Sequence, residues 1–108
     1  MTAAEFSHRL RLQEAVETQD GGGGIAMDWR DIAEPEVFAR IEVLEQPEVS
    51  LGRALRHPGP CRITLRFRAD VTANMRLIDD SYAYHIMSFR DPDGRGALLA
   101  ITALRSPL

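Results

Sequence analysis

Apolar and polar side chains alternate at every second position along much of the chain, the pattern of a β-strand with one buried face. In RITLRFR at 62–68, Ile63, Leu65 and Phe67 share one face, and arginines and a threonine occupy the other. In HRLRLQ at 8–13, leucines share one face and Gln13 lies on the polar face. The segments YAYHIMSF at 82–89 and ALLAITAL at 97–104 are apolar on both faces, as in central or interface strands. The pattern predicts strands at 8–17, 25–29, 37–44, 62–68, 76–78, 82–89 and 97–104.

Residues typical of tight turns separate these segments. They occur at Asp20-Gly21, in DDS at 79–81 and in DPDGRG at 91–96. We therefore expect a mainly all-β chain, a small antiparallel β-barrel or sandwich of about 6–7 strands, with turns about 10 residues apart. The whole of 1–108 is expected to form one domain. At most one or two short helices are expected, at 3–10 and 48–55.

The segment EQPEVSLGRALRHPGP at 45–60 is too long and too rich in proline for a tight turn. Long connections in compact domains are usually functional or disordered. We expect a long inserted loop that contacts a neighbouring subunit or DNA. Its candidate contact residues are Val49, Leu51, Arg53, Leu55, Arg56 and His57.

Four consecutive glycines at 21–24 follow Asp20. A dinucleotide-binding loop would lead into a helix, but here a strand pattern follows. A P-loop needs a lysine, and the chain has none. A linker needs a domain on each side, and too few residues precede the glycines. Because Asp-Gly is a strong hairpin signal, we expect a hairpin whose tip is these glycines.

The composition is that of a soluble globular protein, with 44% hydrophobic and 27% charged residues in 108. No apolar run approaches the roughly 20 residues of a membrane span, and the N-terminus lacks the pattern of a signal peptide. We expect no contact with a membrane. The single cysteine, Cys61, fits a reducing cytoplasm and is expected to be a buried apolar residue.

Charge divides unevenly between the two halves of the chain. Residues 1–50 hold eleven acidic and four basic residues, a balance of −7, whereas 51–108 hold five acidic and nine basic residues, a balance of +4. Such a division suggests charge-complementary, head-to-tail contacts between subunits of a ring. The alternative is that the two halves fold together and their charges intermingle.

All thirteen basic residues are arginines, which suit bidentate pairing with carboxylates or phosphates. Arginines on one strand face are commonly solvated and also block aggregation at a sheet edge. As a functional alternative, we interpret them as a subunit contact with acidic partners. The candidate interface charges are Glu42, Glu45, Glu48, Arg62, Arg66 and Arg68.

No catalytic or metal-binding constellation stands out. The three histidines, His8, His57 and His85, lack the close spacing of a zinc site. The aspartates at 91 and 93 favour a turn over a calcium site, since the oxygen-ligand pattern does not continue. Those at 79 and 80 alternate faces and do not form an acid–base pair. We expect no enzyme activity, no cofactor and no metal.

The ordered series of segments resembles the phage head–tail joining (head–tail adaptor) family. The elements are HRLRLQEAVETQDGGGG followed by a tryptophan, then VFARIEVL, then RITLRFRADVTANMRLIDDSYAYHIMSFRDPDGRGALLAI. No single element is specific, but their order is, and the resemblance runs from about His8 to Leu104. Two positions depart from the family pattern: Phe38 replaces a usual tryptophan, and Asp80-Ser81 replaces a usual Asp-Gly.

The resemblance implies a structural protein in the neck of a virion or phage-like particle, synthesised and assembled in the bacterial cytoplasm. Such proteins form a homo-oligomeric ring, commonly a hexamer, between a portal-side adaptor protein and a tail terminator or tail tube protein. Some are stoppers that hold packaged DNA in the channel. The arginine-rich sequence also resembles neck proteins of alphaproteobacterial gene transfer agents. The alternatives are a tail-side completion or terminator protein, and a soluble β-barrel binding module.

Overall fold

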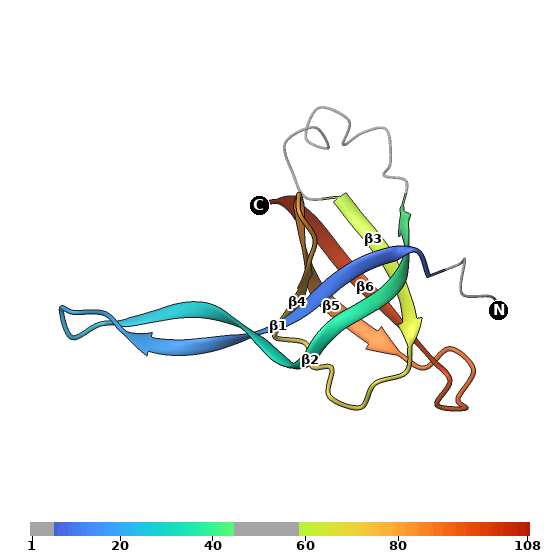
Figure 1. The fold of residues 1–108 in the computed structure, drawn as a ribbon, viewed down its shortest axis with the longest axis horizontal. Helices are drawn as coiled ribbons and strands as arrows, with labels where there is room; N and C mark the ends of the chain where they lie inside the picture. The colour runs from blue at the N-terminus through green and yellow to red at the C-terminus, as the bar shows by residue number, and fades with distance from the viewer. Residues whose placement is uncertain (1–5, 45–58) are drawn as a thin grey trace.

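The computed structural model describes residues 6–44 and 59–108. Six strands form one antiparallel sheet that closes on itself in the order β1-β2-β3-β6-β5-β4 (Figure 1). The all-β antiparallel prediction is confirmed, and no helix occurs within the described ranges. The strands are β1 His8–Gln19, β2 Ile25–Val43, β3 Gly59–Arg66, β4 Met75–Ile78, β5 Tyr82–Arg90 and β6 Leu98–Pro107.

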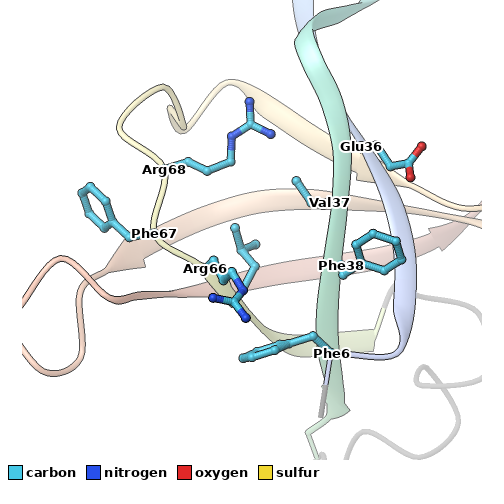
Figure 2. A pocket seen from close by; sticks show the side chains of 8 residues that line it. Phe6, Glu36, Val37, Phe38, Arg66, Phe67 and Arg68 are labelled. Carbon is cyan, nitrogen blue, oxygen red and sulfur yellow. The ribbon is translucent and has the colours of Figure 1, made fainter. Parts of the chain in front are cut away.

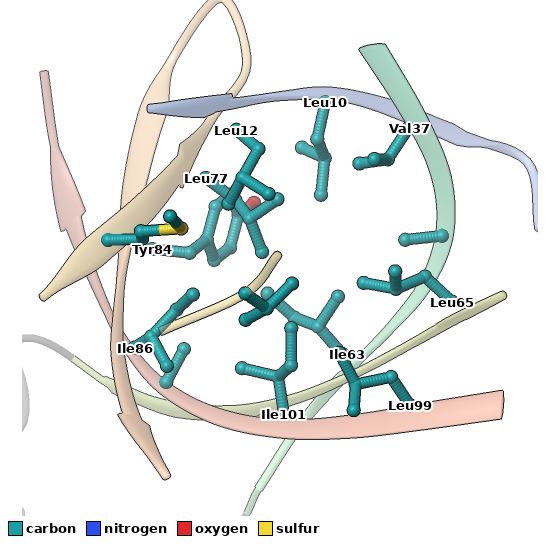
Figure 3. Close-up of a cluster of buried hydrophobic side chains, with 14 of the residues drawn as sticks. Leu10, Leu12, Val37, Ile63, Leu65, Leu77, Tyr84, Ile86, Leu99 and Ile101 are labelled. Atoms are coloured by element: carbon teal, nitrogen blue, oxygen red, sulfur yellow. The ribbon is translucent and has the colours of Figure 1, made fainter. Parts of the chain in front are cut away.

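The interior of the closed sheet is filled by aliphatic side chains from all six strands (Figure 3). Alternate residues of each strand point inward, which is why the period-2 pattern located most strands correctly. Cys61 is fully buried in this core, as expected, and burial raises the pKa of its thiol. The largest fully buried side chains are Leu10, Leu12, Ile63, Leu65, Leu77, Leu99 and Ile101.

The strands expected at 25–29 and 37–44 are wrong as separate elements, because both belong to β2. The pairing with β1 shifts register at the joint: Arg11 opposes Glu36, but Gln13 opposes Asp31. Glu34, in this extra loop of β2, has a φ of 52°, a left-handed conformation that costs a residue with a side chain about 1–2 kcal/mol. The chain therefore bends within one long strand instead of reversing.

Arg68, two residues after the end of β3, stabilises this bend of β2. Its guanidinium donates to the carbonyl oxygens of Glu34 at 2.8 Å and Ala33 at 3.3 Å. The same group forms a bidentate pair with Asp70, at 2.9 and 2.8 Å. Carbonyls that lack a partner strand at the bend are thereby satisfied.

Two other predictions need correction at the strand ends. Phe67 was expected to face inward with Ile63 and Leu65, but β3 ends at Arg66 and the Phe67 side chain is 42% exposed. The helix suggested at 3–10 is wrong over its described part, because Phe6 and Ser7 are irregular and β1 begins at His8. The helix suggested at 48–55 lies outside the described residues.

The predicted glycine hairpin is confirmed, with Gln19 of β1 paired to Ile25 of β2. Asp20 closes the turn: its amide donates to the Gly24 carbonyl at 3.1 Å, and its Oδ1 accepts from the amides of Gly22 and Gly24, each at 2.9 Å. Gly23 has a φ of 86°, and a Cβ on Gly24 would lie 2.7 Å from the Asp20 carboxylate. The positive φ therefore favours glycine at position 23, and a side chain at position 24 would require the Asp20 carboxylate to move.

The pairing of β1 with β4 ends at Glu14, which lies opposite Met75. From Ala15 to the hairpin tip, β1 pairs only with the first residues of β2. This part of the hairpin, residues 15–29, projects away from the closed sheet (left in Figure 1). We call it the arm. The arm gives the molecule its elongated dimensions of 50 × 39 × 25 Å.

Candidate assembly surfaces

One face of the arm carries unburied apolar side chains. Ile25, Met27 and Trp29 follow one another on this face, paired with Gln19, Glu17 and Ala15 of β1. Ile25 is 70% exposed and Met27 is 63% exposed. A two-stranded hairpin is marginally stable alone, so a row of exposed apolar side chains on it indicates a partner surface.

The arm is also acidic. Residues 15–29 contain three carboxylates, from Glu17, Asp20 and Asp28, and no basic residue. Glu17 lies opposite Met27 and so points to the apolar face. Asp28 points to the other face, where its Oδ1 accepts the amide of Trp29 at 2.8 Å.

A cluster of polar and aromatic side chains fixes the base of the arm. Gln13 is only 8% exposed; its amide donates to Asp31 at 2.8 Å, and its carbonyl accepts from Arg76 at 2.9 Å. Arg76 in turn lies over the ring of Trp29, 4.5 Å from its centroid. His85 lies beside the same indole, with ring centroids 6.1 Å apart.

The electrostatics of this base follow from burial. Burial lowers the pKa of Arg76, an effect that the nearby Asp28 carboxylate partly opposes. Burial and the neighbouring Arg76 charge also lower the pKa of His85, so this histidine is mainly neutral at neutral pH. The cluster therefore contacts the base of the arm through hydrogen bonds from Gln13 and Arg76 and through the packing of Arg76 and His85 on Trp29.

The opposite wall of the barrel carries an arginine-lined groove. The pairing Arg62–Thr102–Ser88 runs across β3, β6 and β5, and Thr64–Ala100–Arg90 runs beside it. All six side chains therefore share the outer face of the sheet, with small residues of β6 between two arginines. The groove, of about 190 Å³, is lined by Arg62, Ser88, Phe89, Arg90, Ala100 and Thr102.

The predicted interface charges take different places. Arg62 and Arg66 lie exposed on the outer face of β3, whereas Arg68 is held at the β2 bend. Glu42, register partner of Arg62, pairs with Arg40 on its own strand at 3.2 Å. Within residues 6–44 and 59–108 no ion pair engages Arg62, Arg66 or Arg90. Outside the described residues lie Glu45, Glu48, Val49, Leu51, Arg53, Leu55, Arg56 and His57.

A second groove lies where β2 passes the end of β3 (Figure 2). Its volume is about 240 Å³, and Phe6, Phe38 and Phe67 contribute aromatic rings to it. Phe38 is 54% exposed, and Arg66 borders the rings. Phe38 occupies the position at which the resembled pattern has tryptophan, so an aromatic side chain is retained at this exposed site.

The acidic turns serve the backbone. Asp91 accepts amides from Gly96, Gly94 and Asp93 at 2.6, 2.9 and 3.1 Å, and these bonds lower its pKa. Asp79 accepts the amides of Ser81 and Tyr82 and the hydroxyl of Tyr84. The turn interpretation is confirmed at both places.

In the described part of the chain no three metal-ligating side chains cluster. Nor is any helix there long and apolar enough to cross a membrane.

The family model for phage head completion proteins matches residues 1–106. The chain belongs to this family. It is accordingly a structural protein of a phage or phage-like particle, as the motif series led us to expect. No curated protein matches the sequence.

Two solved structures share the fold of this head completion protein. A chain in the virion of a native gene transfer agent particle superposes with a TM-score of 0.64 at 22% identity, covering 94% of each chain. Protein SF1141 from Shigella flexneri 2a, solved in solution, gives a TM-score of 0.68 at 22% identity, covering 98% of this chain and 97% of SF1141. Both likenesses extend over nearly the whole barrel and arm.

Sequence reasoning missed Arg90 and the base of the arm. Arg90 ends β5, and only the β3-β6-β5 order brings it beside Arg62. Gln13 lies on the polar, outer face as the alternation predicted, paired with Arg76 of β4, but its side chain is only 8% exposed there. No local sequence signal marks either relationship.

Proposed function

We propose that this protein is a head–tail connector of a tailed phage or gene transfer agent. In this proposal it forms a ring, commonly of six subunits, between a portal-side adaptor and the tail, and helps to retain DNA in the channel. The match of residues 1–106 to the head completion family carries the proposal. The role is structural, and we assign no catalytic residue.

The surfaces of the barrel support an assembly role. An arm with exposed apolar residues, an arginine-lined groove and an aromatic groove are all unoccupied by the described residues of the chain itself. Exposed apolar rows and arginines without intramolecular partners are expected on a protein that is completed by neighbours.

Residues 45–58 are proposed as the element that reaches the channel or the adjoining ring. The two ends of this segment are joined by a hydrogen bond from the Leu44 amide to the Pro60 carbonyl, at 2.9 Å. They therefore emerge side by side at one end of β2 and β3, and a long insertion between them places little demand on the barrel.

Gene deletion tests the connector role. Without this protein, heads should package DNA but fail to join tails, and the packaged DNA should leak. Electron microscopy and nuclease sensitivity of the released particles measure both effects. Tailed, DNA-retaining particles from the deletion strain would contradict the proposal. DNA-tight heads with tails of abnormal length would instead indicate a tail terminator.

A variant lacking residues 47–59 separates the loop from the barrel. It should unfold cooperatively, as the intact chain does, yet fail to restore tailed, DNA-retaining particles to the deletion strain. Normal complementation by this variant would show that the loop is not the gate.

A further inference from the structure

We propose that the arm of one copy of this chain docks in the arginine-lined groove over β6 of a second copy. The inference rests on the proposed ring, because it names the contact by which neighbouring subunits join. It combines two surfaces that the function does not yet explain: the acidic, apolar arm and the Arg62–Arg90 groove.

The two surfaces lie on opposite walls of the barrel. In the closed order β1-β2-β3-β6-β5-β4, β6 is three strands away from β1 in either direction. The arm leaves from β1 and β2 (left in Figure 1), whereas the groove lies over β6. A contact between unlike surfaces on opposite sides is heterologous, and repetition of such a contact yields a ring when the rotation closes.

Charge supports this occupant. The arm carries no basic residue, and its Glu17 lies on the apolar face, whereas the groove presents Arg62 and Arg90 without a carboxylate among its lining residues. The strands that carry the two arginines flank β6, so their backbones stand about 10 Å apart. A hairpin strand that enters between them places a carboxylate within reach of either guanidinium, where bidentate pairing is favourable.

Apolar contact supports it as well. The groove floor is formed by Ala100 and Thr102, small residues that leave room for larger side chains, and Phe89 at its edge is 41% exposed. Met27 and Ile25 are exposed on the same arm face as Glu17. Docking this face covers both the apolar row and the phenyl ring, whereas a DNA backbone would leave the apolar residues exposed.

Cysteine crosslinking of the purified chain tests the contact without a particle. Met27→Cys on the arm combined with Ala100→Cys in the groove should give dimers and a ladder of higher oligomers with a short bismaleimide. The native Cys61 is fully buried and should not react. The matched control is Thr18→Cys with Ala100→Cys, because Thr18 lies on the other face of the arm.

Several-fold more product from the Met27 pair than from the Thr18 pair supports the docking. Equal yields from the two pairs would overturn the docking. Crosslinked product from the Met27→Cys single variant would also overturn it, because it indicates an arm-to-arm contact. Single charge reversals, Glu17→Arg or Arg62→Glu, should lower the crosslinking by about tenfold. Combining the two reversals should restore it.

Particles distinguish this contact from the proposed function. If the purified chain crosslinks as expected but is absent from particle necks, the connector role fails and the contact stands. If Glu17→Arg abolishes crosslinking yet normal tailed particles form, the docking is not the ring contact. Binding of short duplex DNA that is lost in Arg90→Glu, without arm crosslinks, would overturn the docking in favour of DNA.

Discussion

The guanidinium of Arg76 lies over the indole of Trp29, 4.5 Å from the ring centroid, and joins β4 of the barrel to the arm. The same guanidinium donates through Nε to Gln13, which bonds Asp31 across the hairpin. The arm is therefore attached by more than its two strands. One cation–π contact and a buried, hydrogen-bonded amide add to the strand pairing at the base of the arm.

Removal of the indole should loosen the arm without unfolding the barrel. Trp29→Ala deletes the contacts with Arg76 and His85. We expect the free energy of opening the arm to fall by about 1 kcal/mol, the size of a partly buried cation–π contact. Amide exchange in residues 15–19 and 25–29 should accelerate, while exchange in β3 and β6 stays slow. Trp29→Phe, which keeps an aromatic ring, should have a smaller effect. Unchanged exchange in the arm of Trp29→Ala would show that Arg76 does not hold it.

At the bend of β2, a substitution should leave stability unchanged or increase it. Glu34 adopts a φ of 52°, which glycine tolerates, so Glu34→Gly should be neutral or should stabilise the protein by up to about 1 kcal/mol. Glu36 lies in the same strand and pairs with Arg9 at 2.7 Å. Glu36→Gly should therefore destabilise, by about 1 kcal/mol from backbone entropy. Urea unfolding of both variants measures the difference, and a clear loss of stability in Glu34→Gly would contradict the strain.

Alkaline pH should weaken the fold through Tyr84. Burial and the adjacent Asp79 carboxylate raise the pKa of Tyr84 to about 12 in the folded protein, against 10.0 for the free side chain. Between these values the unfolded chain loses the phenolic proton and the folded chain keeps it, so stability falls as the pH rises from about 10 to 12.

The phenolic proton can be isolated by substitution. Tyr84→Phe should remove most of this alkaline loss in urea unfolding measured from pH 9 to pH 12. Cys61 contributes in the same direction, because burial also raises its pKa, so a small decline should remain. An identical decline in wild type and Tyr84→Phe would contradict the assignment.

Features that depend on neighbouring residues in the sequence could be predicted, whereas features that depend on distant residues could not. The hairpin was predictable because Asp20 and the glycines that follow it determine the turn locally. The unity of β2 was not, because Arg68, which holds the bend, lies 34 residues from Glu34 in the sequence. Alternation predicted the outward direction of Arg62, a one-strand property. It did not predict the groove, which depends on the order of three strands.

The isolated protein should be monomeric or only weakly associated at micromolar concentration. A contact built from a narrow hairpin and a groove of about 190 Å³ is small, and ring closure should need the adaptor ring as a template. Size exclusion with light scattering measures the mass. A stable hexamer at that concentration would contradict this expectation.

Electron cryomicroscopy of the assembled particle tests the connector role most directly. The account predicts a ring of six-stranded barrels in the neck, between the portal-side adaptor and the tail, with each arm reaching the β6 wall of its neighbour. Density for this chain in the tail fibres, or its absence from the neck, would contradict the account.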